Sequence, residues 1–125
     1  ALTGAWAEVQ RGLLPAEIAA RHAAGSVVAG VCTGVMLLAA AGLLRGRPAV
    51  THRVALEALR ESGAEVHPKA RVVDDGDVLT AGGVTSALDL ALHIVVRERG
   101  AEHAAVEARR LEYESGGPIL DRRPA

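Results

Sequence analysis

The chain has 125 residues, which suits one domain, and half of them are hydrophobic, mostly Ala, Val and Leu. Its net charge is −1, with acidic and basic residues interspersed, so the sequence has no electrostatic footprint for DNA or RNA. Aromatic residues make up 2% and Phe is absent, which argues against an aromatic stacking platform for single-stranded nucleic acid.

Helices and short apolar strands are expected to alternate along the chain. Helices are predicted over residues 5–23, 33–43, 53–63, 84–100 and 101–114, and strands over 26–31, 49–52 and 64–68, with a hairpin over 70–83. The hairpin turn is predicted at the sequence Asp-Asp-Gly-Asp, because Asp-Gly between apolar runs favours a tight turn. This order predicts an α/β layered fold with a mostly parallel sheet, residues 1–125 forming a single domain and 115–125 a tail.

The uncharged run over residues 23–44 is long enough to cross a bilayer, and Gly30 and Gly34 form a G-x-x-x-G pair typical of helices packed in lipid. Three features argue against a membrane span. Gly and Ala dominate the run, Arg21 and Arg45 flank both ends, and the composition changes from β-branched residues to strong helix formers. We therefore expect a buried strand followed by a helix, and no membrane contact.

Cys32 is the only cysteine, which excludes an internal disulfide and a cysteine metal cluster. A single thiol fits a reducing compartment, and the first ten residues lack the basic and apolar regions of a signal peptide. We therefore expect a cytoplasmic protein.

The sequence Gly30-Val31-Cys32-Thr33-Gly34 has the G-x-C-x-G pattern of a nucleophile elbow, placed between the predicted strand and helix. Such a turn is so tight that a side chain two residues before or after the nucleophile is expected to clash. The thiol would lie at a helix N-terminus, where backbone N–H groups favour a thiolate and can hold an oxyanion. The alternative is a small, inert buried cysteine in a Gly-rich crossover.

A thiol nucleophile usually needs a base or an orienting group, and the chain has five histidines. His52 follows the next predicted strand and is expected to reach the same sheet edge as Cys32. His93 is expected in the core, His22 and His103 on solvated helix faces, and nothing specific surrounds His67. No two histidines have the spacing of a zinc site, and Asp-Asp-Gly-Asp lacks the spacing of a calcium loop, so we expect no metal and no cofactor.

Taken together, the ordered motifs resemble the ThiJ/PfpI family of the class I glutamine-amidotransferase-like superfamily. They are "VAGVCTGVMLLAAAGLLRGRPAVTH", "RVVDDGDVLTAGGVTSALDLALHIV" and "LEYE", between residues 26 and about 114. The form of these motifs is most similar to the isonitrile-hydratase-like branch, and it also resembles the sensor domains of some AraC-type regulators.

The resemblance implies a flavodoxin-like three-layer sandwich, usually a homodimer acting on a small-molecule substrate. It implies Cys32 as the catalytic nucleophile, His52 as a second catalytic residue, and Thr33 and Gly34 as substrate-binding neighbours. Gly82, Gly83 and Thr85 match a structural loop and helix start of the family, which the resemblance does not include among the catalytic residues.

The chain departs from the family at its N-terminus. Family members have a further N-terminal portion with the first strands of the sheet, an acidic residue that hydrogen-bonds the cysteine, and a Gly-rich loop. We therefore expect an N-terminally incomplete domain, whose sheet has an exposed edge.

Three functions follow as hypotheses. The first is a cysteine-dependent hydratase or hydrolase, a lyase- or hydrolase-type enzyme acting on a small electrophile such as an isonitrile. The second is a non-catalytic ligand-sensing, redox-sensing or dimerisation domain. The third is a glyoxalase, deglycase or peptidase activity, as found elsewhere in the family.

Overall fold

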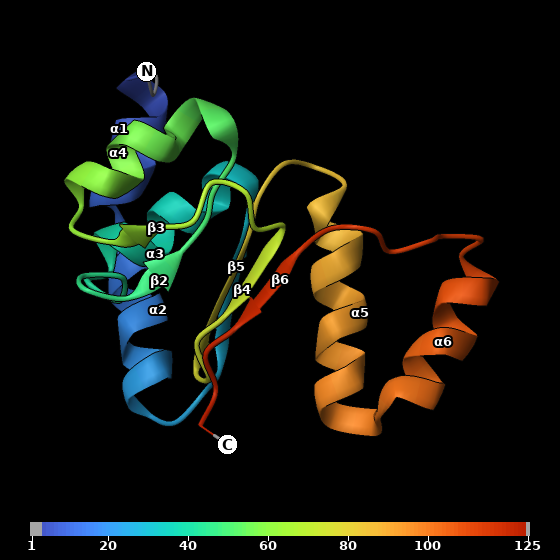
Figure 1. Ribbon diagram of the computed structural model, residues 1–125. Coiled ribbons are helices and arrows are strands. Elements are labelled where there is room, and N and C mark those ends of the chain that lie inside the picture. The colour runs from blue at the N-terminus through green and yellow to red at the C-terminus, as the bar shows by residue number, and fades with distance from the viewer. Residues whose placement is uncertain (1–3, 125) are drawn as a thin grey trace.

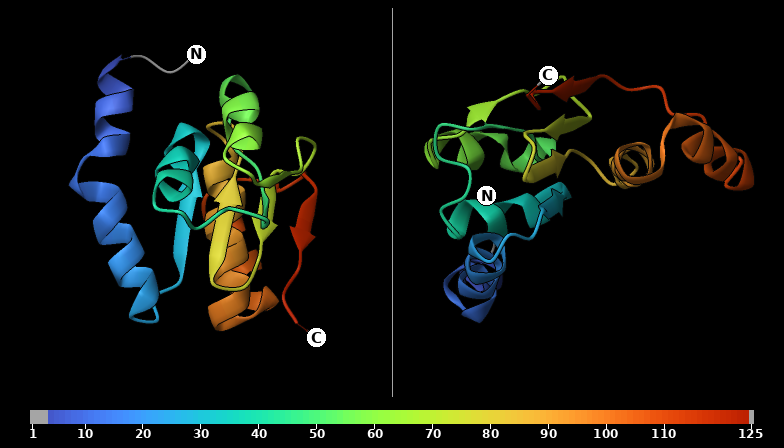
Figure 2. Two further views of the ribbon diagram at one scale, coloured as in Figure 1. Left: turned by 90° about the vertical axis from the view of Figure 1, so that its left-hand side faces the viewer. Right: turned by 90° about the horizontal axis from the view of Figure 1, so that it is seen from below.

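The computed structural model describes residues 4–124 and forms three layers (Figures 1 and 2). A central sheet lies between a layer formed by α5 and α6 and a layer that contains the other helices. The predicted α/β fold with a mostly parallel sheet is confirmed, because three of the four strand pairings in the described residues are parallel.

The central sheet has the strand order β1-β5-β4-β6. Its strands are β1 (Val28–Val31), β4 (Val72–Asp74), β5 (Val78–Ala81) and β6 (Ile119–Asp121). β1 and β5 are parallel, with Val31 opposite Ala81, so both strands end at the same edge of the sheet. β4 and β5 form the predicted antiparallel hairpin around Gly76. A separate pair contains β2 (Pro48–Ala49) and β3 (Glu65–Val66).

Six α-helices lie in the described residues. They are α1 (Gly4–Arg11), α2 (Leu13–Ala23), α3 (Val35–Ala40), α4 (Leu56–Glu61), α5 (Ser86–Arg99) and α6 (Ala101–Arg110). Short 3-10 turns, η1 (Cys32–Gly34) and η2 (Arg53–Ala55), precede α3 and α4.

Both faces of the sheet are covered by apolar side chains. One cluster lies among β5, α3 and α4; it contains Val35, Met36, Leu38, Leu44, Ala49, Ala55, Leu59, Ala64 and Val78. The other lies against α5; it contains Val72, Leu79, Ala81 and Leu90. Every residue of β5 is buried, as expected for a strand in the middle of a sheet with two covered faces.

Two predicted segments are wrong. The helix predicted over 5–23 is interrupted at Gly12, which has an extended backbone and separates α1 from α2. The tail predicted at 115–125 contains β6, because its backbone pairs with β4 from Val72 to Asp74. Propensity gave no signal for β6, since its formation depends on a partner some 47 residues away in the chain.

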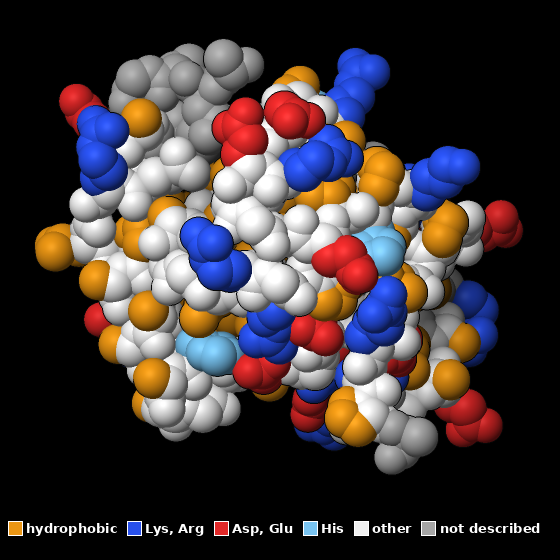
Figure 3. Space-filling view, turned by 60° about the vertical axis from the view of Figure 1, so that its left-hand side comes forward, with side chains coloured by type: hydrophobic (Ala, Val, Ile, Leu, Met, Phe, Trp, Pro, Cys, Tyr) orange, Lys and Arg blue, Asp and Glu red, His pale blue; other side chains and the backbone are white. Residues whose placement is uncertain are grey.

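The remaining elements occur where they were predicted but are shorter. The strand predicted over 49–52 is reduced to β2, which pairs with β3 rather than entering the central sheet beside β1. No helix in residues 4–124 is long and apolar enough to cross a membrane, and the uncharged run divides into β1 and α3 as predicted. The expectation that this strand is buried is wrong: only Gly30 is buried and Ala29 is exposed, because β1 is an edge strand of the sheet. Charged side chains of both signs are spread over the face in Figure 3, without a single basic patch.

Candidate active site around Cys32

Cys32 occupies the turn between β1 and η1 in a left-handed backbone conformation, with φ of 58°. This conformation is uncommon for a residue with a side chain, and such strained residues concentrate at functional sites. The predicted strand-to-helix turn at Cys32 is therefore confirmed as backbone geometry. Thr33 and Gly34 follow in the same 3-10 turn, and all three residues are half-buried.

The two glycines of the motif have different environments. A Cβ on Gly30 would lie 3.1 Å from the Cα of Val35 and 3.1 Å from Cδ1 of Leu38, so the close approach of strand and helix requires glycine. A Cβ on Gly34 would have no described atom within 4 Å. The expected clash at both positions is thus correct for Gly30 and wrong for Gly34, because η1 directs position 34 away from β1.

Backbone hydrogen bonds fix Cys32 to the neighbouring loops. Its N–H donates to the carbonyl oxygen of Gly82 at 3.0 Å, just beyond the end of β5. Its own carbonyl oxygen accepts from the Thr51 hydroxyl at 2.7 Å. Thr51 is 2% exposed, so the Cys32 turn is held by a buried side chain from the β2–η2 loop. The loop that leads to His52 therefore lies beside Cys32, although β2 itself is outside the central sheet.

His52 is the N-cap of η2, and its Nδ1 accepts a hydrogen bond from the Val54 N–H at 3.2 Å. In a neutral imidazole this contact places the proton on Nε2, so Nε2 acts as a donor and not as a base. In the described residues no hydrogen bond joins Sγ of Cys32 to His52 or to a carboxylate. His52 is thus near the Cys32 turn, but arranged as a hydrogen-bond donor.

A hollow of about 250 Å³ opens beside this turn. Its walls include Thr51 and Gly82, the two residues bonded to the Cys32 backbone. The lining comes from three loops and the start of α5: Val50, Thr51, His52, Arg53, Leu56, Pro68, Lys69, Ala70, Arg71, Gly82, Gly83 and Ser86. The hollow offers a small ligand both polar and apolar groups next to the strained cysteine turn, and Cys32 itself is not among its lining residues.

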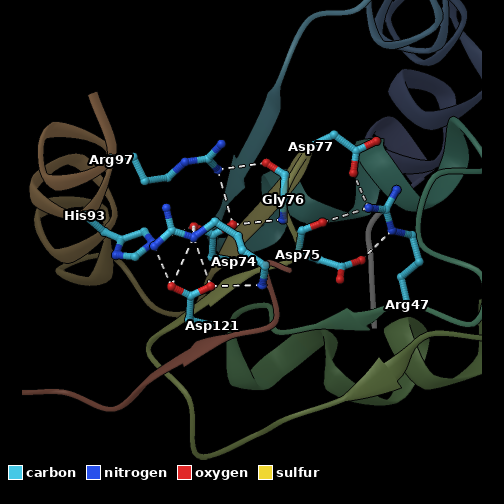
Figure 4. A network of polar contacts seen from close by, with 9 residues as sticks. Arg47, Asp74, Asp75, Gly76, Asp77, His93, Arg97 and Asp121 are labelled. Atoms are coloured by element: carbon cyan, nitrogen blue, oxygen red, sulfur yellow. Dashed lines mark hydrogen bonds and ion pairs between the residues drawn. The ribbon is translucent and has the colours of Figure 1, made fainter. Parts of the chain in front are cut away.

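The other histidines lie away from Cys32. His93 is buried as predicted, and its Nε2 lies 2.6 Å from a carboxylate oxygen of Asp74 (Figure 4). Arg97 at 3.2 Å and Arg123 at 3.3 Å also contact Asp74, which is fully buried. Asp121 lies close to this group, and a hydrogen bond from Arg123 lowers its pKa to about 2. Both carboxylates of this cluster, which also contains potential metal ligands, are thus paired with arginine side chains.

His22 and His103 were both predicted on solvated faces. This is correct for His103, which is exposed, but His22 is partly buried and pairs with Asp77 at 2.6 Å. Arg47 also pairs with Asp77 (Figure 4). The hydrogen bond from Arg47, followed by that from His22, lowers the Asp77 pKa to about 2.

Asp89 of α5 is a second buried carboxylate, and the sequence did not predict its contacts with other side chains. It is 1% exposed and accepts hydrogen bonds from Arg71 at 2.6 Å, Ser115 at 2.7 Å and Tyr113 at 3.0 Å. Burial alone would raise the Asp89 pKa, but the three hydrogen bonds outweigh it and lower the pKa. Thr85, the residue before α5, accepts from Arg71 and makes no side-chain capping bond.

Comparison with known proteins shows which family the chain is similar to. The DJ-1/PfpI family model matches residues 15–97. Isonitrile hydratase from Pseudomonas putida is 39% identical over 102 residues, which are 82% of this chain and 44% of that protein. The HTH-type transcriptional regulator GbdR from Pseudomonas aeruginosa is 35% identical over 91 residues, 72% of this chain and 25% of the regulator.

A solved structure gives the same result. The crystal structure of a ThiJ/PfpI family protein from Pseudomonas syringae superposes with a TM-score of 0.73 at 36% identity, over 83% of this chain and 43% of that chain. The flavodoxin-like fold implied by the resemblance is thus confirmed, and the chain spans less than half the length of these relatives. The chain belongs to the DJ-1/PfpI family, also named ThiJ/PfpI.

Proposed function

We propose that the complete protein is a cysteine-dependent hydratase or hydrolase of small electrophiles, similar to isonitrile hydratase. The observation that carries the proposal is Cys32 at φ 58°, in a tight turn directly after β1. The 39% identity with an isonitrile hydratase supports the choice of electrophile. Because the chain spans 44% of that relative, the proposal concerns the activity of the whole protein.

In this mechanism the sulfur of Cys32 attacks the terminal carbon of an isonitrile. A C–S bond forms, and the thiol proton ends on that carbon, giving a thioformimidate. Water then adds its oxygen to the same carbon, one water proton goes to nitrogen, and the other returns to sulfur as the C–S bond breaks. The product is an N-substituted formamide, with thiol regenerated and all atoms accounted for.

The roles of the neighbouring residues follow from their positions. The backbone N–H of Thr33, directly after the nucleophile, is proposed to stabilise developing negative charge. Gly34, which leaves open space beside the turn, is proposed to admit the substrate. His52, with Nδ1 already accepting from Val54, is proposed to donate from Nε2 and thereby orient the substrate rather than deprotonate the thiol.

The test is turnover of a simple alkyl isonitrile by the full chain, with the N-alkyl formamide quantified by mass spectrometry. We expect product with the native protein and none with Cys32→Ala, the fold of each being checked by circular dichroism. His52→Ala is expected to retain reduced turnover, and His103→Ala, an exposed histidine on α6, serves as its matched control. Equal turnover by native protein and Cys32→Ala would refute the mechanism.

The second candidate is a ligand-sensing domain without turnover. It is favoured by the 35% identity with a transcriptional regulator and by the lack of a described hydrogen bond to the Cys32 thiol. Thiol alkylation measured across pH separates the candidates, because an unreactive Cys32 would argue against both catalysis and redox sensing. The homodimer and the cytoplasmic location stay predictions; sedimentation velocity and cell fractionation of the full protein test them.

A further inference from the structure

The hollow beside Cys32 has an uneven charge. Three basic side chains line it, Arg53, Lys69 and Arg71, and no acidic side chain does. Arg71 is already paired with Asp89 at 2.6 Å. Arg53 and Lys69 are exposed, and neither makes an ion pair within residues 4–124. Two positive charges therefore face the hollow without a counter-charge from the described chain.

Ser86 adds a buried donor to the same wall. It is the first residue of α5, is 4% exposed and lines the hollow. Its N–H donates to the carbonyl oxygen of Gly83 at 2.8 Å, whereas its hydroxyl has no hydrogen-bond partner in the described part of the chain. Buried hydroxyl groups are nearly always hydrogen-bonded, so this one is suited to a ligand in the hollow.

His52 supplies a further donor. The bond from Val54 to Nδ1 leaves the proton on Nε2. The adjacent ring carbon, Cδ2, lies 3.5 Å from the position of a Cβ on Gly83, which also lines the hollow. This edge of the ring thus faces the loop that leads to Ser86.

We propose that the hollow binds the carboxylate of a small organic anion, held by Arg53, Lys69, the Ser86 hydroxyl and Nε2–H of His52. The ligand of this hollow is then an anionic small molecule that lies beside the Cys32 turn, with its apolar part against Val50 and Leu56. This assignment deepens the proposed function and rests on it for the role of the thiol, but binding itself does not need Cys32.

The experiment measures binding of propanoate to the full chain carrying Cys32→Ala, by two-dimensional NMR titration, with propanamide as the neutral analogue. We expect propanoate to bind about tenfold tighter than propanamide, the size of one charge-assisted hydrogen bond. Ser86→Ala and Arg53→Gln are each expected to weaken propanoate binding about five- to tenfold. Arg109→Gln, an exposed arginine on α6, is the matched control and is expected to change nothing.

Equal affinity for the two probes would overturn the proposal. It would mean that the carbonyl oxygens of Thr51 and Ala70, which lie 3.7 and 4.0 Å from the position of a Cβ on Gly82, accept from the amide as well as the basic side chains hold the carboxylate. Propanoate binding that is unchanged in both Arg53→Gln and Lys69→Gln would also overturn it. Binding without isonitrile turnover by the complete protein would refute the proposed function alone, and turnover without propanoate binding would refute this inference alone.

Discussion

The elbow region, residues 28–40, and the C-terminal segment, residues 113–121, are held in the fold by different forces. The elbow is continuous in sequence, and apolar side chains and one tight glycine hold its strand against its helix. The C-terminal segment is attached through polar contacts to distant residues. Tyr113 and Ser115 donate to Asp89, and the Arg71 N–H donates to the Pro118 carbonyl oxygen. Packing of local neighbours thus forms one region, and a buried carboxylate anchors the other.

Replacing Asp89, the carboxylate that anchors the C-terminal segment, is expected to give the largest difference in stability between the two regions. Asp89→Asn removes the charge that faces Arg71, and breaking a buried ion pair costs about 3 kcal/mol of unfolding free energy. Amide hydrogen exchange should show faster exchange in β6, with β1 unchanged until the protein unfolds globally.

Glu107→Gln is the control for that variant, because Glu107 lies on the surface of α6 and contacts Arg110 only within its own helix. We expect a change below about 0.5 kcal/mol in urea titration. If Asp89→Asn were as stable as Glu107→Gln, the carboxylate would not be the anchor of the C-terminal segment.

The two glycines of the elbow provide the next largest effect. Gly30→Val adds atoms where even a Cβ lies 3.1 Å from Val35 and Leu38, and overpacking of this kind costs about 2 kcal/mol. Gly34→Ala meets open space at φ −59°, so it should be neutral or stabilise by up to about 1 kcal/mol. Thermal unfolding of both variants checks the contrast, and equal losses would contradict it.

The same contrast explains how much of the molecule the sequence predicts. The turn at Cys32 is recognisable because Gly30, the β-branched strand and the helix formers are consecutive. The hairpin is recognisable for the same reason, from Asp-Gly at its turn. β6 and the Asp89 anchor cannot be recognised in this way. Tyr113 contacts Asp89, which lies 24 residues earlier in the chain, and no residue near Tyr113 in the sequence indicates that contact. The Thr51 bond to Cys32 and the buried Ser86 hydroxyl depend on loops whose spacing has no local signature.

Thr51→Val tests whether a polar contact also supports the elbow. It removes the hydroxyl that donates to the Cys32 carbonyl oxygen, at a cost of about 1 kcal/mol. That oxygen still accepts from the Val35 N–H, which limits the loss. We expect altered alkylation kinetics of the Cys32 thiol in the folded state. Ser26→Ala, which removes an exposed hydroxyl before β1, is the control, and identical kinetics in the two variants would show that packing alone holds the turn.

Acid should give the smallest effect, and this effect should be larger in the C-terminal segment than around Cys32. The folded-state pKa of Asp89 is lowered, and that of Asp121 is lowered to about 2 from its ordinary 3.8 by the hydrogen bond from Arg123. A carboxyl group with a depressed folded pKa stabilises the fold fully above its unfolded pKa. That contribution is lost as pH falls from about 4 towards 2.

Residues 28–40 contain no carboxylate. Asp77, whose carbonyl oxygen accepts from the Val28 N–H, lies at the opposite end of β1 from Cys32. Amide protection of Leu120 should therefore fall between about pH 4 and pH 2 by more than that of Cys32, whose N–H is bonded to Gly82. An equal fall at both amides would mean that the carboxylates stabilise the whole sheet rather than its C-terminal strand.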